Sequence, residues 1–356
     1  MGICGYINFL EAINNRDVIK FAWLLTDAIF QYTETVEDLT PADDTPNDFW
    51  MACYDGDTDT VKELAYENPA LVTRVDEYND NRNGFLVACC GGSIDVIKYL
   101  AEKDPALINS VDKNNDNGLH LASRQDRMGT MVFLVEELKM DPSVTGRYER
   151  NSFLWACWCG NFEMLKYLAE KDPELANSVD KYKYSRTSFL MACYGGKITI
   201  VKYLAENYPK LITSVDKNND NGLHLAIKQN KNEVAKFLVE EFKLNPADEG
   251  RHKNNSFMCA YLCKNDAMFE YLAENHPELI NIVDKHNSDR NIFLRACSDG
   301  RTEIFDYLVG INSELIHSVD KYNDNGVDLT TTKQIMFFLA DKLGLEPDDY
   351  IHKCLW

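Results

Sequence analysis

The amino-acid sequence predicts an all-α solenoid of about ten helix-turn-helix units with finger loops, and two observations predict it. The segment SVDKNNDNGLHLA occurs at 110–122 and again at 214–226, and a diverged copy, SVDKYNDNGVDLT, occurs at 318–330, so that successive copies lie 104 residues apart. A shorter period of about 34 residues runs inside each 104-residue block. Self-similarity at fixed spacing is typical of a stack of like units and not of one globule.

The shorter period is marked by a small residue that closes the pattern Phe-x-x-Ala or Leu-His-x-Ala. From Ala52 onward this residue recurs after 36, 34 and 34 residues, and the three steps then repeat. The series is Ala12, Ala52, Ala88, Ala122, Ala156, Ala192, Ala226, Ala260, Ala296 and Thr330. Three units therefore make one block, and the chain contains a triplicated three-repeat block over roughly 49–152, 153–256 and 257–356.

Each unit is expected to contain two short helices. A first helix, such as 85–90, ends at Gly91-Gly92, where glycine supplies the left-handed conformation that stops a helix. A second helix follows, as over 93–102, and Ser93 can cap its start. Prolines end many second helices: Pro105, Pro173, Pro209 and Pro277. Such short helices must bury their apolar faces on neighbouring units, because neither is stable alone.

A polar finger follows each second helix, as over 109–118, and its Asn, Asp and Lys residues predict a hairpin-like turn. Every third finger is two residues longer and carries an arginine at the same position: Arg82, Arg186 and Arg290. Tyr182 and Tyr184 lie in the same finger as Arg186, and a second class of finger contains Arg147-Tyr148 and Arg251-His252. These Arg and Tyr residues suit recognition of an acidic or helical protein segment, and the alternative is that they are solvated charges.

The ends of the chain depart from the pattern. Residues 1–48 are expected to form an irregular N-terminal repeat and an acidic connection, 49–330 the regular array, and 331–356 a C-terminal capping helix and tail. The capping helix is expected over 333–343. The three segments form one continuous solenoid without an internal domain boundary.

The units resemble the ankyrin repeat. Asn117-Gly118-Leu119-His120-Leu121-Ala122 and its copy at 221–226 keep the Leu-His-x-Ala part of the family pattern T-P-L-H-x-A, although the Thr-Pro pair is missing. The resemblance implies that second helices form an outer wall, while fingers and first helices line a concave groove where partners dock. It also implies that His120 and His224 are structural and hydrogen-bond the neighbouring turn.

Aligning the units gives a candidate partner-binding row. The position two residues after the recurring small residue holds Tyr54, Cys90, Arg124, Trp158, Tyr194, Lys228, Leu262 and Ser298. Trp158 and Tyr194 lie at its centre, Arg124 and Lys228 flank them, and Trp155 belongs to a second row on the same helices. Aromatic and arginine side chains dominate interface energetics, so these residues are binding candidates together with Tyr54 and the finger residues. The alternative is that Trp155 and Trp158 only pack between units.

Composition narrows the classes of function. The formal charge of −20 disfavours general binding to nucleic acid or anionic lipid. The eleven cysteines fit no disulfide framework and are typical of helix packing in a reducing compartment, so a cytoplasmic protein is expected. No apolar run approaches the roughly 20 residues that a membrane helix needs. Met1-Gly2 lacks the Ser or Thr of a myristoylation signal, since Tyr6 stands there.

The sequence contains only incomplete matches to metal-binding motifs. Asp112 to Gly118 has oxygen ligands at the first positions of a calcium loop, but its glycine is shifted by one and Ser123 replaces the final Glu. Cys157-x-Cys159 and Cys259-x-x-x-Cys263 have no second pair at zinc-ligand spacing. We therefore expect no enzyme activity, no cofactor and no metal.

The predicted function is a non-enzymatic scaffold that binds a partner protein in the concave groove and fingers, with a monomer favoured. The alternative is a host-directed adaptor that recruits a target to ubiquitin-ligase or other machinery through the array. Block triplication and Asn/Asp/Lys-rich fingers resemble arrays from large DNA viruses or intracellular bacteria, which places the protein in a host cytoplasm.

Overall fold

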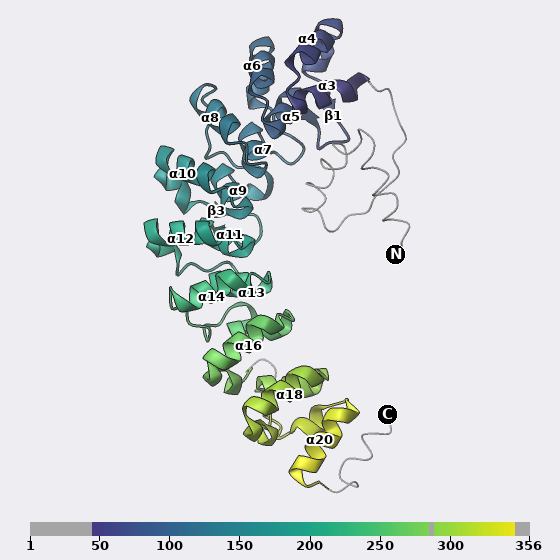
Figure 1. Ribbon diagram of the computed structural model, residues 1–356, viewed down its shortest axis with the longest axis vertical. Coiled ribbons are helices and arrows are strands. Elements are labelled where there is room, and N and C mark those ends of the chain that lie inside the picture. Colours follow the sequence, from purple (N-terminus) through teal and green to yellow (C-terminus); the bar gives the residue numbers. More distant parts are fainter. Residues whose placement is uncertain (1–44, 285–287, 346–356) are drawn as a thin grey trace. The chain divides into compact units, whose positions relative to one another are not determined.

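A computed structural model describes residues 45–284 and 288–345 of the 356-residue chain, and these residues form a helical repeat array (Figure 1). The chain divides into two compact units, Met1–Thr45 and Pro46–Trp356. The array lies in the second unit. The irregular repeat expected within 1–48 falls almost entirely outside the described residues.

Nine helix pairs follow one another in the described part of the chain. The first helices of the pairs are α3 (Thr45–Asp55), α5 (Gly84–Gly91), α7 (Gly118–Arg124), α9 (Ser152–Cys159), α11 (Ser188–Gly195), α13 (Gly222–Lys228), α15 (Ser256–Leu262), α17 (Ile292–Asp299) and α19 (Gly326–Leu329). The second helices are α4 (Thr58–Glu67), α6 (Ile94–Lys103), α8 (Met128–Glu136), α10 (Phe162–Lys171), α12 (Ile198–Asn207), α14 (Asn232–Glu240), α16 (Asp266–Asn275), α18 (Thr302–Ile311) and α20 (Lys333–Leu343). The helix predicted over 333–343 is thus confirmed as α20.

Short 3-10 helices and hairpins connect the pairs. Six 3-10 helices follow second helices, most of them starting at the predicted prolines: η1 (Pro69–Val72), η2 (Pro105–Asn109), η4 (Pro173–Asn177), η5 (Pro209–Leu211), η7 (Pro277–Asn281) and η8 (Ser313–His317). Two others, η3 (Arg147–Glu149) and η6 (Arg251–Lys253), lie in fingers. Two long fingers are antiparallel hairpins, β1 (Val75–Asp76) with β2 (Arg82–Asn83) and β3 (Val179–Asp180) with β4 (Arg186–Thr187).

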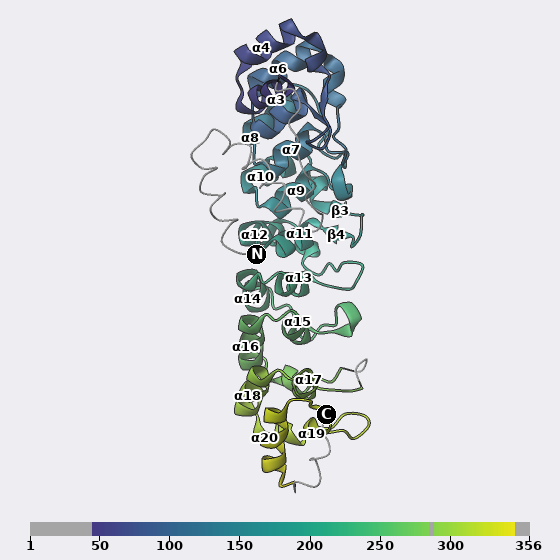
Figure 2. The same ribbon diagram turned by 90° about the vertical axis from the view of Figure 1, so that its right-hand side faces the viewer.

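The elements lie in layers. Second helices form one row, first helices form the next row, and the fingers extend from the side of the first helices away from the second helices (Figure 2). Each first helix contacts the first helices of its neighbours, as α9 contacts α7 and α11. The core therefore runs along the array between the two helical rows, as burial of each unit on the next requires.

The first helices pack closely through a recurring cysteine and glycine. A Cβ atom added to Gly118, at the start of α7, would lie 2.8 Å from the Sγ atom of Cys89 in α5. The same relation recurs between Cys193 and Gly222. The reduced cysteines thus serve as small core residues, and the glycine gives them room.

The helix ends confirm one expectation and correct another. Gly92 and Gly196 adopt the left-handed conformation at the ends of α5 and α11, as predicted. The expectation that Ser93 caps α6 through its side chain is wrong, because its hydroxyl makes no cap hydrogen bond. The hydroxyl instead donates to the backbone carbonyl oxygen of Tyr54 in the preceding unit, at 2.9 Å.

This bond belongs to a series that joins neighbouring units. The residue immediately before a second helix donates a hydrogen bond from its side chain. The acceptor is a backbone carbonyl oxygen near the end of the first helix of the preceding unit. Besides Ser93, the donors are Arg127 to Cys90, Asn161 to Ser123, Asn265 to Ile227 and Arg301 to Tyr261. The last carbonyl oxygens of a helix have no partner within it, so the following unit satisfies them.

A second series of bonds joins neighbouring fingers, and we call each set of finger-to-finger side-chain bonds a joint. In the commonest type, which we call the arginine joint, an arginine pairs with the aspartate 30 residues later, as Arg82 Nε does with Asp112 Oδ2 at 3.2 Å. The next residue, Asn83, caps α5 and donates to the hydroxyl of Ser110 at 2.8 Å. The repeated Ser-Val-Asp motif is therefore the acceptor half of a joint.

Arginine joints occur four times in the described residues, and a histidine replaces the arginine elsewhere. The four ion pairs are Arg82–Asp112, Arg150–Asp180, Arg186–Asp216 and Arg290–Asp320. In the histidine joints, His120 and His224 bond the backbone carbonyl oxygens of Val144 and Asp248. The structural role that the family resemblance implied for both histidines is confirmed.

The joint between fingers 251–255 and 282–290 has lost the residues of both types. Asn254 stands where other joints have arginine, and Ile282 stands where they have serine. Asp284 keeps the acceptor position, and its carboxylate lies 3.8 Å from Arg295.

We expect Gly118→Ala to destabilise the array by about 1–3 kcal/mol, because the new methyl group overpacks against Cys89. Adding Cys89→Ala should relieve this clash, so a double-mutant cycle in urea should show positive coupling between the two changes. Gly129→Ala is the matched control, since its Cβ would meet only Ile94 Cδ1 at 3.5 Å and α8 should gain stability. Additive effects of the Gly118 and Cys89 changes would contradict the packing argument.

Asn254→Arg should raise the free energy of unfolding by about 0.5–1 kcal/mol, because it restores an arginine opposite Asp284 in a partly buried joint. Thermal melts of the full chain measure the effect, and Asn254→Met controls for side-chain length. A gain that is equal for Met and Arg would show that packing and not ion pairing is responsible.

Candidate functional site

The predicted finger arginines lie in joints. The side chains of Arg82 and Arg186 are buried, with 4% and 10% exposed, whereas that of Arg290 keeps 20%. Each guanidinium faces the aspartate of the following finger. In the structure these three residues therefore connect fingers, and their charges are balanced within the array.

Around α9 and α11 the predicted aromatic residues gather into one group, which we call the aromatic–arginine cluster. It consists of Tyr148, Arg150, Trp155, Trp158, Arg186 and Tyr194. Trp155 and Trp158 stack in parallel, with ring centroids 5.5 Å apart and an interplanar angle of 8°. Trp158 then meets Tyr194 edge to face, with centroids 6.1 Å apart.

Arg150 lies at the centre of the cluster. Its Cζ atom is 4.2 Å from the ring centroid of Trp158, 4.9 Å from that of Trp155 and 5.0 Å from that of Tyr148. Its Nε donates to Asp180 at 2.9 Å. Burial lowers the pKa of Arg150, and the nearby charge of Arg186 lowers it further, while Asp180 opposes both effects. The guanidinium remains charged at neutral pH, since the ordinary pKa of arginine is so high.

Arg186 makes the same arrangement one unit later. Its Cζ atom lies 4.1 Å from the ring of Tyr194 and 4.6 Å from that of Tyr184. Its Nε is 3.7 Å from Asp216 Oδ2, which is longer than in the other three arginine joints. The stacking on two rings and the ion pair compete for one guanidinium, and the rings hold the closer contacts.

The exposed fractions of its aromatic side chains divide the cluster into a buried base and an exposed outer face. Trp155 is buried at 1%, whereas Trp158 and Tyr194 are partly exposed. Tyr182, whose ring lies 5.3 Å from that of Tyr148, is 62% exposed at the end of its finger. Aromatic contacts, and cation–π contacts for Trp158 and Tyr194, hold these rings in place.

The flanking residues lie in ion pairs. Arg124 pairs with Asp116 at 3.3 Å and also covers Trp155, with its Cζ atom 5.1 Å from the ring. Lys228 pairs with Asp220 at 2.5 Å and keeps 26% of its side chain exposed. Tyr54 lies on α3, three units before α9, and is partly exposed. The structure thus brings together Arg124, Trp155, Trp158, Tyr182, Tyr184, Arg186 and Tyr194, and places Tyr54, Arg82 and Arg290 on other units.

Sequence reasoning missed Arg150 as a site residue. It directly precedes the helix cap Asn151, as Arg82 precedes Asn83 and Arg290 precedes Asn291. Alignment by 104-residue blocks hid this match, because Arg150 belongs to a different finger of the block. Alignment on the cap residue would have found it.

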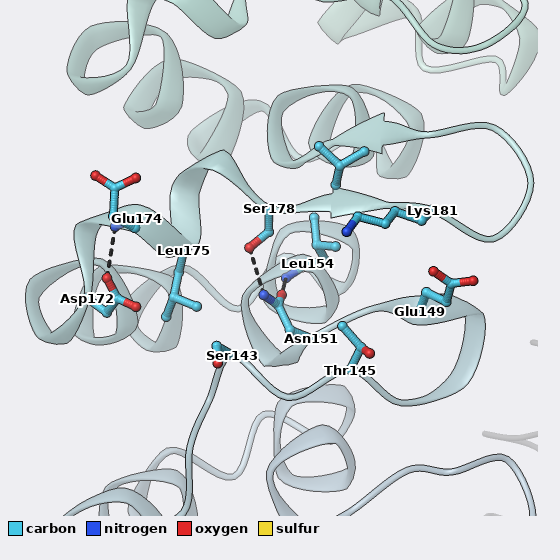
Figure 3. A pocket seen from close by; sticks show the side chains of 11 residues that line it. Ser143, Thr145, Glu149, Asn151, Leu154, Asp172, Glu174, Leu175, Ser178 and Lys181 are labelled. Atoms are coloured by element: carbon cyan, nitrogen blue, oxygen red, sulfur yellow. Dashed lines mark hydrogen bonds between the residues drawn. The ribbon is translucent and has the colours of Figure 1, made fainter.

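One small pocket lies between the finger at 143–149 and the start of the next finger (Figure 3). Its volume is about 290 Å³, and its lining includes Glu149, Asp172, Glu174 and Lys181. Asn151 donates across it to Ser178 at 2.7 Å. Its four charged side chains and small size are poorly suited to a drug-sized apolar ligand, so it carries no functional assignment.

Cysteine and membrane features bear on the remaining expectations. Nine cysteines in the described ranges carry free thiols, and seven of them are buried. No group of three or more potential metal ligands occurs among residues 45–284 and 288–345. Within those same ranges, every helix is too short or too polar to cross a membrane.

The comparison with known families agrees with the repeat architecture. A family model described as ankyrin repeats (3 copies) matches residues 49–146, 153–248 and 190–282, which together make up more than half of the chain. No curated protein matches the chain.

The two joint histidines predict a pH dependence of stability. Burial lowers the pKa of both His120 and His224 below 6.5, so the folded state favours neutral imidazoles and the unfolded state binds protons first. Their contribution to stability is therefore complete above about pH 6.5 and is lost as pH falls towards the folded pKa.

Urea titrations at pH 7.5 and 5.5 measure this effect. The slope contributed by each histidine is at most about 1.4 kcal/mol per pH unit. The His120→Gln/His224→Gln variant should be less stable at pH 7.5 but should lose less stability on acidification. An equal loss in variant and wild type would assign the pH dependence to other groups.

Proposed function

Because the chain belongs to the ankyrin-repeat family, whose repeats are generally protein–protein interaction modules, we propose that it is a non-enzymatic scaffold. In this proposal a partner protein binds the first-helix and finger face, centred on the aromatic–arginine cluster. The observation that carries the proposal is the partly exposed pair Trp158 and Tyr194, held over buried ion pairs.

The physical argument concerns entropy and area. Tryptophan and tyrosine supply large contact areas with few rotatable bonds, and residues of this kind dominate binding energy. Arg150 and Arg186 clamp the rings of Trp158 and Tyr194, so less freedom remains to be lost when a partner docks. A prearranged aromatic surface therefore binds more tightly than the same residues on a mobile loop.

The candidate residues take different roles in this proposal. Trp158, Tyr182, Tyr184 and Tyr194 contact the partner, and Lys228 lies at the rim. Trp155, Arg124 and Arg186 position the contact residues from below. Tyr54, Arg82 and Arg290 extend the same face towards the two ends of the array, where a long partner would meet them.

The cysteines bear on the cellular compartment in which the protein acts. Seven buried free thiols fit a reducing compartment, so we propose that the protein acts in the cytoplasm. We propose separately that it is a monomer. The adaptor alternative would need a surface that recruits a second protein. Between residues 45 and 345, leaving aside 285–287, all helices belong to the repeat pairs, so such a surface would have to lie on the array itself.

Trp158→Ala should remove partner capture while changing the melting temperature little. A hot-spot tryptophan contributes about 2 kcal/mol or more to binding, which corresponds to a loss of affinity of about 30-fold. Its side chain is partly exposed, so less core packing is lost than at a fully buried position. Arg124 is left in place, because removing it would leave the Asp116 carboxylate unpaired.

The measurement is an affinity capture from candidate lysates, quantified by mass spectrometry, with wild type, Trp158→Ala and Tyr66→Ala as baits. Tyr66 is 87% exposed on α4, a second helix, and provides a matched exposed aromatic residue away from the cluster. A specific partner should be retained by wild type and Tyr66→Ala and lost by Trp158→Ala. Equal retention by all three baits would refute the assignment of the binding face.

A further inference from the structure

Three buried donors in the cluster make no hydrogen bond with any described residue: Arg150 Nη1, Trp155 Nε1 and Arg186 Nε. Among the described residues, neither Arg150 Nη1 nor Trp155 Nε1 has an acceptor within hydrogen-bonding distance. Arg150 is 7% exposed and Trp155 is 1% exposed. Leaving a buried donor unbonded costs free energy, and the cost is larger for a charged group.

The first two donors belong to side chains that contact each other and the same tryptophan. The Cζ atom of Arg150 is 4.9 Å from the ring centroid of Trp155, and both residues touch the ring of Trp158. Asp180 accepts from Nε of Arg150, whereas Nη1 is buried without an acceptor. What these two donors lack is therefore a hydrogen-bond acceptor.

Arg186 also has a donor without a hydrogen bond, but a possible acceptor lies nearby. Its Nε and the Oδ2 atom of Asp216 both lack hydrogen bonds in the described part of the chain, and they face each other at 3.7 Å. A small shift would bring this donor and this acceptor together. The donors that remain without an acceptor are thus Arg150 Nη1 and Trp155 Nε1.

Trp158 is the cluster residue that contacts both donor residues. It stacks on Trp155, lies over Arg150 and is itself partly exposed. Because Arg150 Nη1 and Trp155 Nε1 are buried, a partner reaches them only after a neighbouring side chain such as that of Trp158 changes its rotamer. Rotamer changes of this kind are common when a partner binds.

We propose that the partner inserts an aspartate or glutamate side chain beside Trp158, and that its carboxylate accepts hydrogen bonds from Arg150 Nη1 and Trp155 Nε1. This inference rests on the proposed function and specifies the chemistry of the partner. A carboxylate has two oxygens that accept from two donors at once, and its bond to a guanidinium is stronger than a bond between neutral groups. Arg150 and Arg186 also lie near enough to repel each other, so an added negative charge is favourable there.

A proline-rich segment is the main competing occupant, because such segments dock on aromatic grooves without needing a carboxylate. A library of random 12-residue peptides, displayed on phage and selected on the full-length protein, separates the two. Phage that also bind Trp158→Ala are removed during selection. We expect the remaining peptides to share an Asp or Glu, and a synthetic peptide to lose at least ten-fold in affinity when that residue becomes Asn or Gln.

Variants of the protein test the two donors directly. Trp155→Phe keeps an aromatic ring and removes Nε1, while Arg150→Lys keeps a positive charge opposite Asp180 and removes Nη1. Each should weaken the acidic peptide several-fold and should reduce the penalty of its Asn or Gln counterpart. Arg301→Lys is the matched control, because Arg301 also lies over an aromatic ring, with its Cζ atom 4.5 Å from the ring of Tyr261, but outside the aromatic–arginine cluster, and it should leave affinity unchanged.

An indole signal gives an independent readout. The Trp155 N–H resonance, assigned by its absence from Trp155→Phe, should move downfield when the acidic peptide binds, because a new hydrogen bond forms. If Arg150→Lys fails to fold, Trp155→Phe and this resonance still decide the question.

The outcomes distinguish this inference from the proposed function. Selected peptides that need Trp158 but lack acidic residues, or that bind equally well as amides, would overturn the carboxylate and leave the binding face in place. An unmoved Trp155 resonance would also overturn it. A selection that yields no peptide dependent on Trp158 would count against both the inference and the binding face.

Discussion

The array depends on polar bonds that cross from one repeat unit to the next. A unit of two short helices cannot bury its own apolar surface, and a hydrophobic stripe alone would let neighbours slide along each other. The bond from Arg82 to Asp112 and the bond from Ser93 to the Tyr54 carbonyl each have one satisfied geometry. Because these partners are largely withdrawn from water, a slipped register would leave charges and carbonyls unbonded.

The same bonds build the candidate binding face. Arg150 is a joint residue that reaches Asp180, and its position there puts the guanidinium against Trp155 and Trp158. Arg186 is likewise held at the Asp216 joint while it stacks on Tyr194. The residues that connect the units are therefore also those that hold the aromatic side chains in place, so binding and stability share components at this point of the array.

Much of the fold was predictable because it follows from periodicity. The repeat of Ala and Gly fixed the positions of the helices, and α20 begins and ends as expected. Local reasoning failed where partners come from another unit: Ser93 matches a cap by residue type, yet its hydroxyl bonds Tyr54. The row of Trp158 and Tyr194 could be found by alignment on the recurring small residue. Arg150 would have needed alignment on the cap residue, and the burial of Arg186 depends on an aspartate 30 residues later in the next finger.

The two kinds of joint also bear on how such a chain can grow. In the described part of the array, arginine joints lie on both sides of a histidine joint. The unit that contains α7 is joined to the preceding finger by the ion pair of Asp112 with Arg82, and to the following finger by the hydrogen bond of His120. If that unit were duplicated alone, the finger after His120 would carry Ser110 and Asp112, which are the acceptors of an arginine joint. Duplication of three consecutive units reproduces every donor with its own acceptor. Insertion of one whole block is thus compatible with these contacts, as is a sequence period three times the structural one.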